Sequence, residues 1–457
     1  MVDVYVIGGG LPELAAALEL AEVGLSVRLT DWQPESPVSD ATVAPGRTVA
    51  HREPRGALPD PEGVLRELLQ HIAAPIAQGG HANAAVRAVA VAPKPVLLRG
   101  AKGGWVPQPV PAALGIPAVP ISSQAVAVIG GGAAARAYLD RVKPVLTIGK
   151  VHSLGELVRS RMGQAVVTKL VDPFVRERFG LTPDDVEVAA ALPGLNEALT
   201  RAGSLSGGVL ANSDRDVARE TGVVPETGWP AAFEELRHRL ELYEAQHASA
   251  PVSAFVSGAD DTWRIEEADG TVVEARAIVT GVDAVSARGA LLAAHEPLRE
   301  LLPRRWRVQA DVAVAAAPAE VGEHAALTAV ELADGEHWAI RIERDAEGAH
   351  RARLSGPVFE SEADRDALAK LDRVAAEVLA ALGLTQQGAV EAQLRLAPYS
   401  STELREAAEA RLASARETAP TLLPVGEALH GGSLATAVAD ARTQAVLLRR
   451  RLAGIAD

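Results

Sequence analysis

Glycine residues that directly follow the first hydrophobic run could bind a phosphate group. The run Val2–Ile7 ends at Gly8, and Gly10 precedes a stretch of helical periodicity that begins at Leu11. Gly8 permits a tight turn, and Gly10 lets a pyrophosphate approach the backbone N–H groups at the start of a helix. Asp31 closes the next short strand, 21 residues after Gly10, where an acid would bind ribose hydroxyls. The pattern predicts a β-α-β dinucleotide-binding unit. Its expected contacts with the ligand are Gly8, Gly10, Leu11 and Asp31.

One side chain opposes the chemistry of this motif. The pattern G-x-G-x-x-G places a third glycine at position 13, but the sequence has Glu13 there. Pro12 beside it has no N–H to offer a phosphate. A carboxylate in the first turn satisfies the helix dipole by itself and would repel a nearby diphosphate. We therefore expect the fold signature to be kept and the ligand signature to be weakened. The alternative is a glycine-rich turn with no ligand.

A second glycine-rich turn lies near the other end of the chain. A short strand at 422–425 reaches Gly426 and Glu427, and a Gly-Gly-Ser turn then leads into a helix that begins at Leu434. The N–H groups at that helix start are available to an anion. Together, the two turns resemble those of flavin-dependent oxidoreductases of the amine-oxidase type, in which both ends of the chain meet on FAD. The resemblance implies FAD contacts from Gly426, Glu427, Ser433 and Leu434.

The middle of the chain narrows the resemblance to the protoporphyrinogen and coproporphyrinogen oxidase family. Four stretches are similar to segments of that family in the same order: 98–120, 154–175, 192–208 and 227–240. The resemblance is closest to the soluble actinobacterial members, and it implies FAD-dependent oxidation of a porphyrinogen, coproporphyrinogen III above all, by dioxygen in haem biosynthesis. It forces no catalytic base. Trp105 and Trp229 lie in two of these stretches and are expected either to line the substrate cavity or to pack in the core.

Departures from the family fall at flavin contacts. After the ribose acid the family has a Gly-Gly-x-x-x-Thr loop on the FAD, whereas this chain offers only Pro45-Gly46-Arg47-Thr48, from which we take Arg47 as a contact. Two alternatives therefore stay open. The chain could be a flavin-fold protein that has lost FAD and serves as a partner or scaffold, for example in haem biosynthesis. It could also be an amine-oxidase-like flavoenzyme that acts on another substrate.

Two further runs imitate known motifs. The run 125–132 repeats the strand-like lead and three glycines, but no strand ending in an acid follows, so we interpret it as a loop without a nucleotide. The run 431–435 resembles a nucleophile elbow around Ser433, but no His and acid can be assigned to it in order. We therefore favour the flavin motif over a hydrolase.

Composition excludes several classes of function. The 457 residues carry a net charge of −14, which disfavours non-specific binding to nucleic acid. Cysteine is absent, which excludes disulfides and thiolate metal sites, and scattered histidines favour no metal site. No apolar stretch is long enough to span a membrane and no basic region precedes the first strand, so a cytoplasmic protein is expected, with peripheral membrane contact left open. Aromatic residues make up only 3%, which predicts a core of Ala, Val and Leu.

These motifs require an α/β chain with a Rossmann-like FAD-binding domain, of the amine-oxidase and porphyrinogen-oxidase type, and an inserted α+β substrate domain. We assign the discontinuous FAD domain to 1–85, 215–285 and 415–457, and the substrate domain to 86–214 and 286–414.

Two groups of arginine residues have no place in these motifs. The group at 304–307 could bind propionate carboxylates, or it could be a solvated loop, which we favour. The group at 449–451 would complement the dipole of the last helix.

Overall fold

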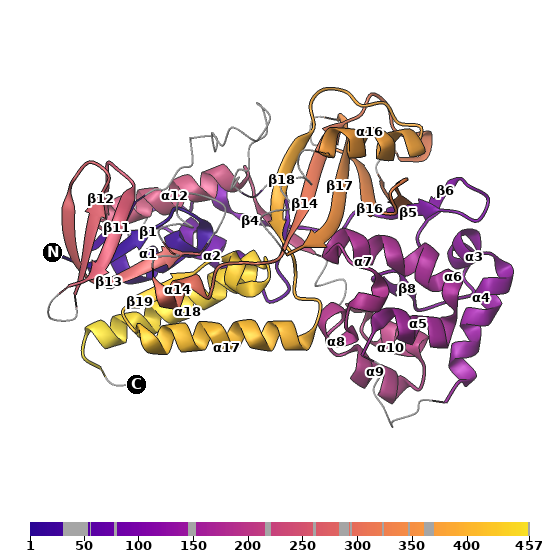
Figure 1. Ribbon diagram of the computed structural model, residues 1–457, viewed down its shortest axis with the longest axis horizontal. Coiled ribbons are helices and arrows are strands. Elements are labelled where there is room, and N and C mark those ends of the chain that lie inside the picture. Colours follow the sequence, from indigo (N-terminus) through magenta and orange to yellow (C-terminus); the bar gives the residue numbers. More distant parts are fainter. Residues whose placement is uncertain are drawn as a thin grey trace.

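The computed structural model describes the chain in segments, and its described residues form two halves (Figure 1). One half holds both termini, and the other holds a second sheet and a cluster of short helices. No helix in the described segments is both long and apolar enough to cross a membrane. The segments are 1–30, 54, 56–76, 80–144, 152–214, 221–258, 262–282, 292, 295–321, 324–345, 348–360 and 370–455.

The first half is built on a mainly parallel sheet. Its strand order is β10-β2-β1-β13-β12-β11, and β19 pairs with the last part of β13. The pairs β1–β2, β1–β13 and β13–β19 are parallel, whereas β11–β12 and β12–β13 form antiparallel pairs. The strands are β1 (Val2–Ile7), β2 (Val27–Thr30), β10 (Gln246–His247), β11 (Val252–Ser257), β12 (Trp263–Glu267), β13 (Val272–Gly281) and β19 (Leu422–Val425).

Helices cover both faces of this sheet. Val4 and Val6 of β1 pack against the helices of one face, and Tyr5 and Ile7 pack on the other. The first core consists mainly of Ala, Val and Leu, as the composition predicts. The helices on that face are α1 (Leu11–Ala21), α2 (Val64–Ala73), α12 (Trp229–Leu242) and α18 (Leu434–Leu452), and α14 (Glu296–Arg299) and α17 (Thr402–Thr418) lie on the other.

The second half contains a mostly antiparallel sheet of order β18-β14-β17-β16-β15-β5-β6. Alternate residues of β14 are buried, with Val308, Ala310 and Val312 packed in a core that also contains α16 (Leu371–Ala381). The strands are β5 (Val96–Arg99), β6 (Trp105–Pro107), β14 (Trp306–Ala313), β15 (Ala325–Glu331), β16 (His337–Arg344), β17 (His350–Phe359) and β18 (Glu391–Leu396).

Short helices cover part of the opposite face of that sheet. Leu327, Val96 and Leu98 share a core with these helices, so this part of the sheet is apolar on both faces. The helices are α3 (Ser123–Ile129), α4 (Gly131–Tyr138), α5 (Leu154–Met162), α7 (Asp172–Phe179), α8 (Val188–Ala191), α9 (Leu195–Ala202) and α10 (Leu205–Ala211). Two small antiparallel sheets complete the described strands. One has the order β3 (Leu58–Pro59), β9 (Gly222–Pro225) and β4 (Ala88–Val91), and the other pairs β7 (Ala112–Ala113) with β8 (Ile116–Pro117).

One prediction of local structure is wrong. The run 125–132 is not a loop, because most of it lies in α3 and the start of α4. Ser122 caps α3, its hydroxyl accepting a hydrogen bond from the N–H of Ala125 at 3.1 Å, and Gly130 separates the two helices at φ 84°.

The stretch 154–175 is not one continuous helix. It breaks at Gly163, where φ is 97°, and continues through a π-helical turn at Val167–Val171.

Candidate functional site

The two glycine-rich turns lie at the same edge of the first sheet. In the parallel register, Ile7 of β1 is opposite Thr280 of β13, and Gly281 of β13 is opposite Val425 of β19. The carboxyl ends of β1 and β19 are therefore separated only by β13. Ligands of open α/β sheets bind outside the carboxyl ends of the strands. The sheet thus brings Gly8–Gly10 and Gly426–Ser433 to one place, although more than four hundred residues separate them in the sequence.

The first turn has the backbone of a phosphate site. Gly8 has φ 133°, a conformation that a residue with a side chain rarely adopts, and its N–H donates to the carbonyl oxygen of Thr30 at 3.2 Å. Gly10 is the N-cap of α1, and Leu11 is the first helical residue. Because glycine has no side chain, the N-cap residue itself does not cover the helix start. The first residues of α1 therefore direct their N–H groups toward this edge.

The carboxylate of Glu13 lies over that same backbone. Glu13 is only 1% exposed. Its Oε2 would be 2.6 Å from a Cβ atom built on Gly10, so the side chain folds back over the N-cap. This is the direction that a glutamate at the third helical position takes in a capping box. The expected conflict is therefore a feature of the structure: a buried carboxylate occupies the approach to Gly10.

The second turn is held by packing against the other half of the molecule. Gly426 has φ 127° and starts the short helix Glu427–His430, and Ser433 caps α18 by accepting from the N–H of Thr436 at 3.4 Å. The phenol of Tyr399 donates to the carbonyl oxygen of Leu429 at 3.1 Å. Burial raises the pKa of Tyr399, so the phenol keeps its proton at neutral pH and remains a donor.

An ion cluster beneath this turn was not expected from the sequence. Asp440 of α18 accepts hydrogen bonds from Arg416 of α17 at 3.0 Å and from Nε2 of His430 at 3.2 Å, and all three side chains are less than one-fifth exposed. Burial alone would raise the pKa of Asp440, but its bonds to His430 and Arg416 outweigh burial, and the net pKa is lowered. The closeness of His430 and Asp440 in the sequence could have suggested a contact between them. Arg416 reaches Asp440 only because α17 packs on α18.

This cluster does not make Ser433 a nucleophile. The Ser433 hydroxyl lies 2.8 Å from that of Thr436 and caps α18, while the nearby His430 is engaged with Asp440. A nucleophilic serine needs its hydroxyl within hydrogen-bond reach of the base. We therefore assign Ser433 the role of a helix cap and not that of a nucleophile.

The two tryptophans pack in cores. Trp229 is 1% exposed among the helices on the first sheet, and its Nε1 donates to the carbonyl oxygen of Gly56 at 2.9 Å. Trp105 belongs to the core of the second sheet, with the guanidinium of Arg99 4.2 Å from its ring centroid. Core packing thus accounts for both residues. Asp31 and Arg47 lie outside the described residues.

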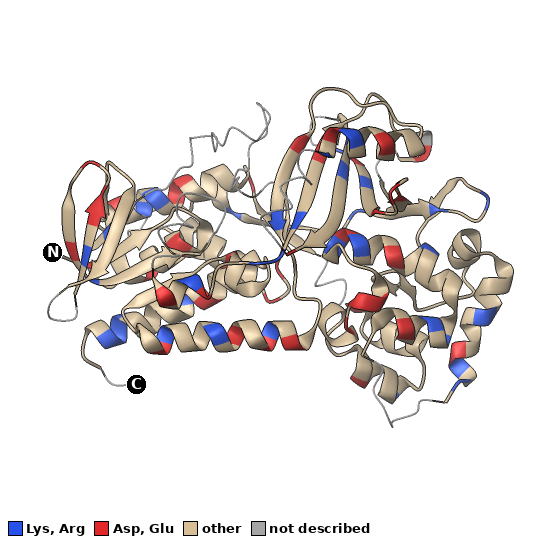
Figure 2. Ribbon diagram, in the orientation of Figure 1, with Lys and Arg blue, Asp and Glu red and all other residues tan. Residues whose placement is uncertain are grey.

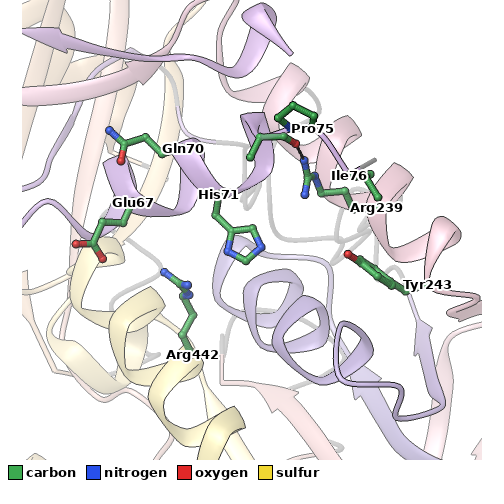
Figure 3. Close-up of a pocket in the computed structure, with 9 residues that line it drawn as sticks. Glu67, Gln70, His71, Pro75, Ile76, Arg239, Tyr243 and Arg442 are labelled. Atoms are coloured by element: carbon green, nitrogen blue, oxygen red, sulfur yellow. Dashed lines mark hydrogen bonds between the residues drawn. The ribbon is translucent and has the colours of Figure 1, made fainter. Parts of the chain in front are cut away.

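A cavity of about 530 Å³ lies elsewhere, between α2, α12 and α18 (Figure 3). His71 projects into it from α2, near Arg442 of α18 and Tyr243 of α12. Its basic side chains already have partners, since His71 lies 2.7 Å from Glu22, Arg442 lies 2.7 Å from Glu19, and Arg239 lies 3.0 Å from Glu235. Glu19 is nine residues along α1 from Gly10, or about 13 Å at 1.5 Å per residue. We therefore do not place the chemistry in this cavity.

Solved structures share the fold. No protein-family model matches the sequence, and no curated protein matches it. A provisionally named protoporphyrinogen oxidase from Exiguobacterium sp. 255-15 has a TM-score of 0.67 at 18% identity, over 98% of this chain and 99% of that chain. An oxidoreductase from Methanosarcina mazei has a TM-score of 0.57 at 15% identity, over 96% and 99%. UDP-galactopyranose mutase has a TM-score of 0.57 at 12% identity, over 100% and 96%.

These likenesses define the class of fold. The chain is an α/β protein that combines a mainly parallel, Rossmann-like sheet with a second, α+β half, and it shares this fold with the three proteins named above. The backbone of both turns fits a dinucleotide, because Gly8, Gly10 and Gly426 place no side chain of their own between the backbone and such a ligand. The Glu13 carboxylate is the part that fits poorly, since its charge would have to be neutralised or moved away from a diphosphate.

Proposed function

We propose that the chain is an FAD-dependent oxidoreductase that oxidises a porphyrinogen with dioxygen as electron acceptor. The porphyrinogen that we propose as its substrate is coproporphyrinogen III. The observation that carries the proposal is the meeting of both glycine-rich turns at the carboxyl edge of one parallel sheet. The order of the family-like segments and the shared fold support it. Haem biosynthesis in the cytoplasm is the setting that follows from this substrate.

The residues have distinct tasks in this proposal. Gly8, Gly10 and Leu11 would bind the diphosphate through their backbone, and the start of α18 at Ser433 and Leu434 would direct its positive dipole end toward the same ligand. Asp31 and Glu427 would accept hydrogen bonds from hydroxyl groups, and Arg47 would contact the ligand from its loop. FAD, when bound, would accept a hydride from the macrocycle.

The second half of the molecule would hold the substrate and keep the second turn in place. Tyr399 links the segment after β18 to Leu429 through its phenol, which stays protonated and so acts as a donor rather than a base. We assign no catalytic base, so the protons released from the substrate would pass to solvent.

The test is the colour and activity of the purified full-length protein. We expect visible flavin absorption after FAD is added, and a gain in unfolding free energy of about 2.7 kcal/mol when free FAD is 100 times its dissociation constant. Coproporphyrinogen III should then be converted to fluorescent coproporphyrin III with consumption of dioxygen. A protein that stays colourless and gains no thermal stability would refute the oxidase proposal.

A matched pair of glycine variants makes this test specific to the first turn. Gly10→Ala should weaken FAD binding about 10-fold or more, because the added Cβ blocks the backbone approach. Its only close contacts are with the far end of the Glu13 side chain, which can move, so the fold should survive. Gly132→Ala in α4 is the control, because its Cβ would meet nothing within 4 Å. Equal FAD affinity in both variants would place the ligand elsewhere.

A second function is favoured by one observation, the buried carboxylate of Glu13 over Gly10. It is the proposal that the fold has lost FAD and serves as a non-catalytic partner, for example of an enzyme of haem biosynthesis. A yellow protein that turns over coproporphyrinogen III would refute this second function. A yellow protein without that turnover would support an amine-oxidase-like flavoenzyme with another substrate.

A further inference from the structure

Three arginines gather at one end of the second sheet. Arg307 of β14 is directly opposite Arg395 of β18, and the carbonyl oxygen of Arg305 accepts from the N–H of Ala397 at 3.1 Å. Because side chains alternate along a strand, Arg305 and Arg307 project from the same face, away from the core under α16. Like charges directly opposite each other in an antiparallel pair are destabilising. The sheet therefore keeps a positive cluster that folding alone does not favour.

The guanidinium groups of this cluster are only partly satisfied by hydrogen bonds. Nε of Arg395 donates to Oε1 of Gln309 at 3.2 Å, but Nε and Nη1 of Arg305 and Nε of Arg307 are buried and have no hydrogen-bond acceptor among the residues that the structure describes. The nearest carboxylate to Arg305 is that of Glu360, at 3.5 Å from Nε, and Glu360 is 78% exposed. Arg307 donates from Nη1 to the backbone carbonyl of Glu177, but the Glu177 carboxylate is bound by Arg341 at 2.7 Å. Burial lowers the pKa of Arg307 to about 10, as expected for a poorly compensated cation.

A nearby arginine provides the contrast. Arg304 is 73% exposed and lies 3.3 Å from Glu300, four residues earlier in the chain, so it is a solvated residue, as we favoured for the whole group. That prediction is wrong for Arg305 and Arg307, whose nitrogens are buried. The Arg305 side chain, just before β14, is 21% exposed, and Arg307 lies in β14 between β17 and β18, so both are partly covered in a way that their sequence position could not reveal.

The cluster lies beside the second glycine-rich turn. Leu396, which follows Arg395, has its Cβ 3.5 Å from the position of a Cβ built on Gly432. Figure 2 shows Lys and Arg on the ends of β14 and β18 that point toward the waist between the two halves. The positive cluster therefore faces the place where a ligand bound at the sheet edge would meet the substrate half.

We infer that Arg305 and Arg307 anchor a carboxylate group of the ligand, with Arg395 adding attraction from the neighbouring strand. A buried polar group without a partner is costly, and an arginine–carboxylate contact offsets that cost with two parallel hydrogen bonds. Arginine binds phosphate by the same geometry. The assignment to a carboxylate rests on the proposed function, because a porphyrinogen carries carboxylates and no phosphate.

The experiment measures binding of coproporphyrin III to the full chain without added FAD. Arg305→Gln and Arg307→Gln should each weaken binding about 10-fold, and the double variant about 100-fold, because each removes a charged hydrogen bond. Arg304→Gln is the matched control and should change binding by less than about two-fold. The tetramethyl ester of coproporphyrin III, which lacks the carboxylates, should bind equally to all these proteins.

Three results would overturn the inference. The first is equal affinity of the wild type and the double variant for coproporphyrin III, or no binding to either. The second is the same loss of affinity for the ester, which would indicate disturbed packing; Arg307→Lys, which keeps the charge, should recover part of the affinity if the fold is intact. The third is a larger loss of affinity for inorganic phosphate than for coproporphyrin III in the arginine variants, which would reject a carboxylate as the ligand group. Because no flavin or turnover is needed, a colourless protein with arginine-dependent binding would refute the oxidase proposal alone.

Discussion

The first glycine-rich turn and the arginine cluster at the end of the second sheet differ in how their charged groups are neutralised. At the turn, an open backbone site for an anion already has the buried carboxylate of Glu13 folded over it. At the sheet, Arg305 and Arg307 keep buried nitrogens with no acceptor among the described residues. One region therefore carries its own anion where the fold usually admits a ligand, and the other leaves its cations incompletely compensated.

The difference teaches which surface depends on a ligand. A helix start with a nearby carboxylate is stabilised without any ligand, so the turn can keep its shape even if FAD binds weakly. Uncompensated cations give the opposite result, since only an added anion restores their hydrogen bonds. Affinity for an anionic substrate and affinity for FAD can therefore be separated in this chain, and variants of each region should show it.

The largest expected effect is on the ion cluster that holds the second turn between these regions. Asp440→Asn should lower the free energy of unfolding by about 3 kcal/mol, because Arg416 would lose its buried partner. The pKa of Asp440 is lowered by folding, so its stabilisation is present above pH 3.8 and is lost as the pH falls through the folded-state pKa. Urea unfolding from neutral pH downward should show the difference between variant and wild type shrinking only in acid.

The control for this variant is Asp334→Asn, which removes an exposed carboxylate 3.3 Å from Arg373. It should change stability by less than about 1 kcal/mol. A loss as small for Asp440→Asn would mean that the second turn does not depend on the cluster.

The next effect concerns the carboxylate at the first turn. Glu13→Gly should raise FAD affinity about 10- to 100-fold, because it removes a charge that would face a diphosphate at short range. Glu13→Gln removes the charge but keeps the size, so it separates repulsion from obstruction. Fluorescence titration with FAD measures both, and unchanged affinity in both variants would show that Glu13 does not limit binding.

The smallest effect is on stability at the sheet. Arg307→Met should raise the free energy of unfolding by about 1 to 2 kcal/mol at pH 7, since removal of a poorly compensated cation outweighs one lost hydrogen bond. The lowered pKa of Arg307 means that the penalty is complete below about pH 10 and is relieved as the pH rises above it. Denaturant unfolding at pH 7 and above pH 10 should therefore show a gap that narrows in base. A destabilised variant would mean that the guanidinium is satisfied within the chain.

Much of the fold at the two ends of the chain was predictable, because it depends on local patterns. The strand and helix that follow Leu422 match the sequence prediction. The last turn of α18 carries Arg449–Arg451, as its dipole favours. The run at 125–132 was misjudged because its apolar residues fit a strand or a helix equally well, and the cap at Ser122 decided for a helix. The domain boundaries and the flavin contacts stay predictions.

The sequence by itself determined that two glycine-rich turns each join a strand to a helix, since glycine and short periodic runs act over a few residues. It also placed a glutamate where a third glycine was expected. Only the tertiary structure decided that both turns meet at one sheet edge, because the pairing of β1 and β19 with β13 joins segments far apart in the chain. It alone buried Nε and Nη1 of Arg305 and Nε of Arg307 and left Arg304 in solvent, because burial depends on which segments pack beside a residue and not on the residue itself.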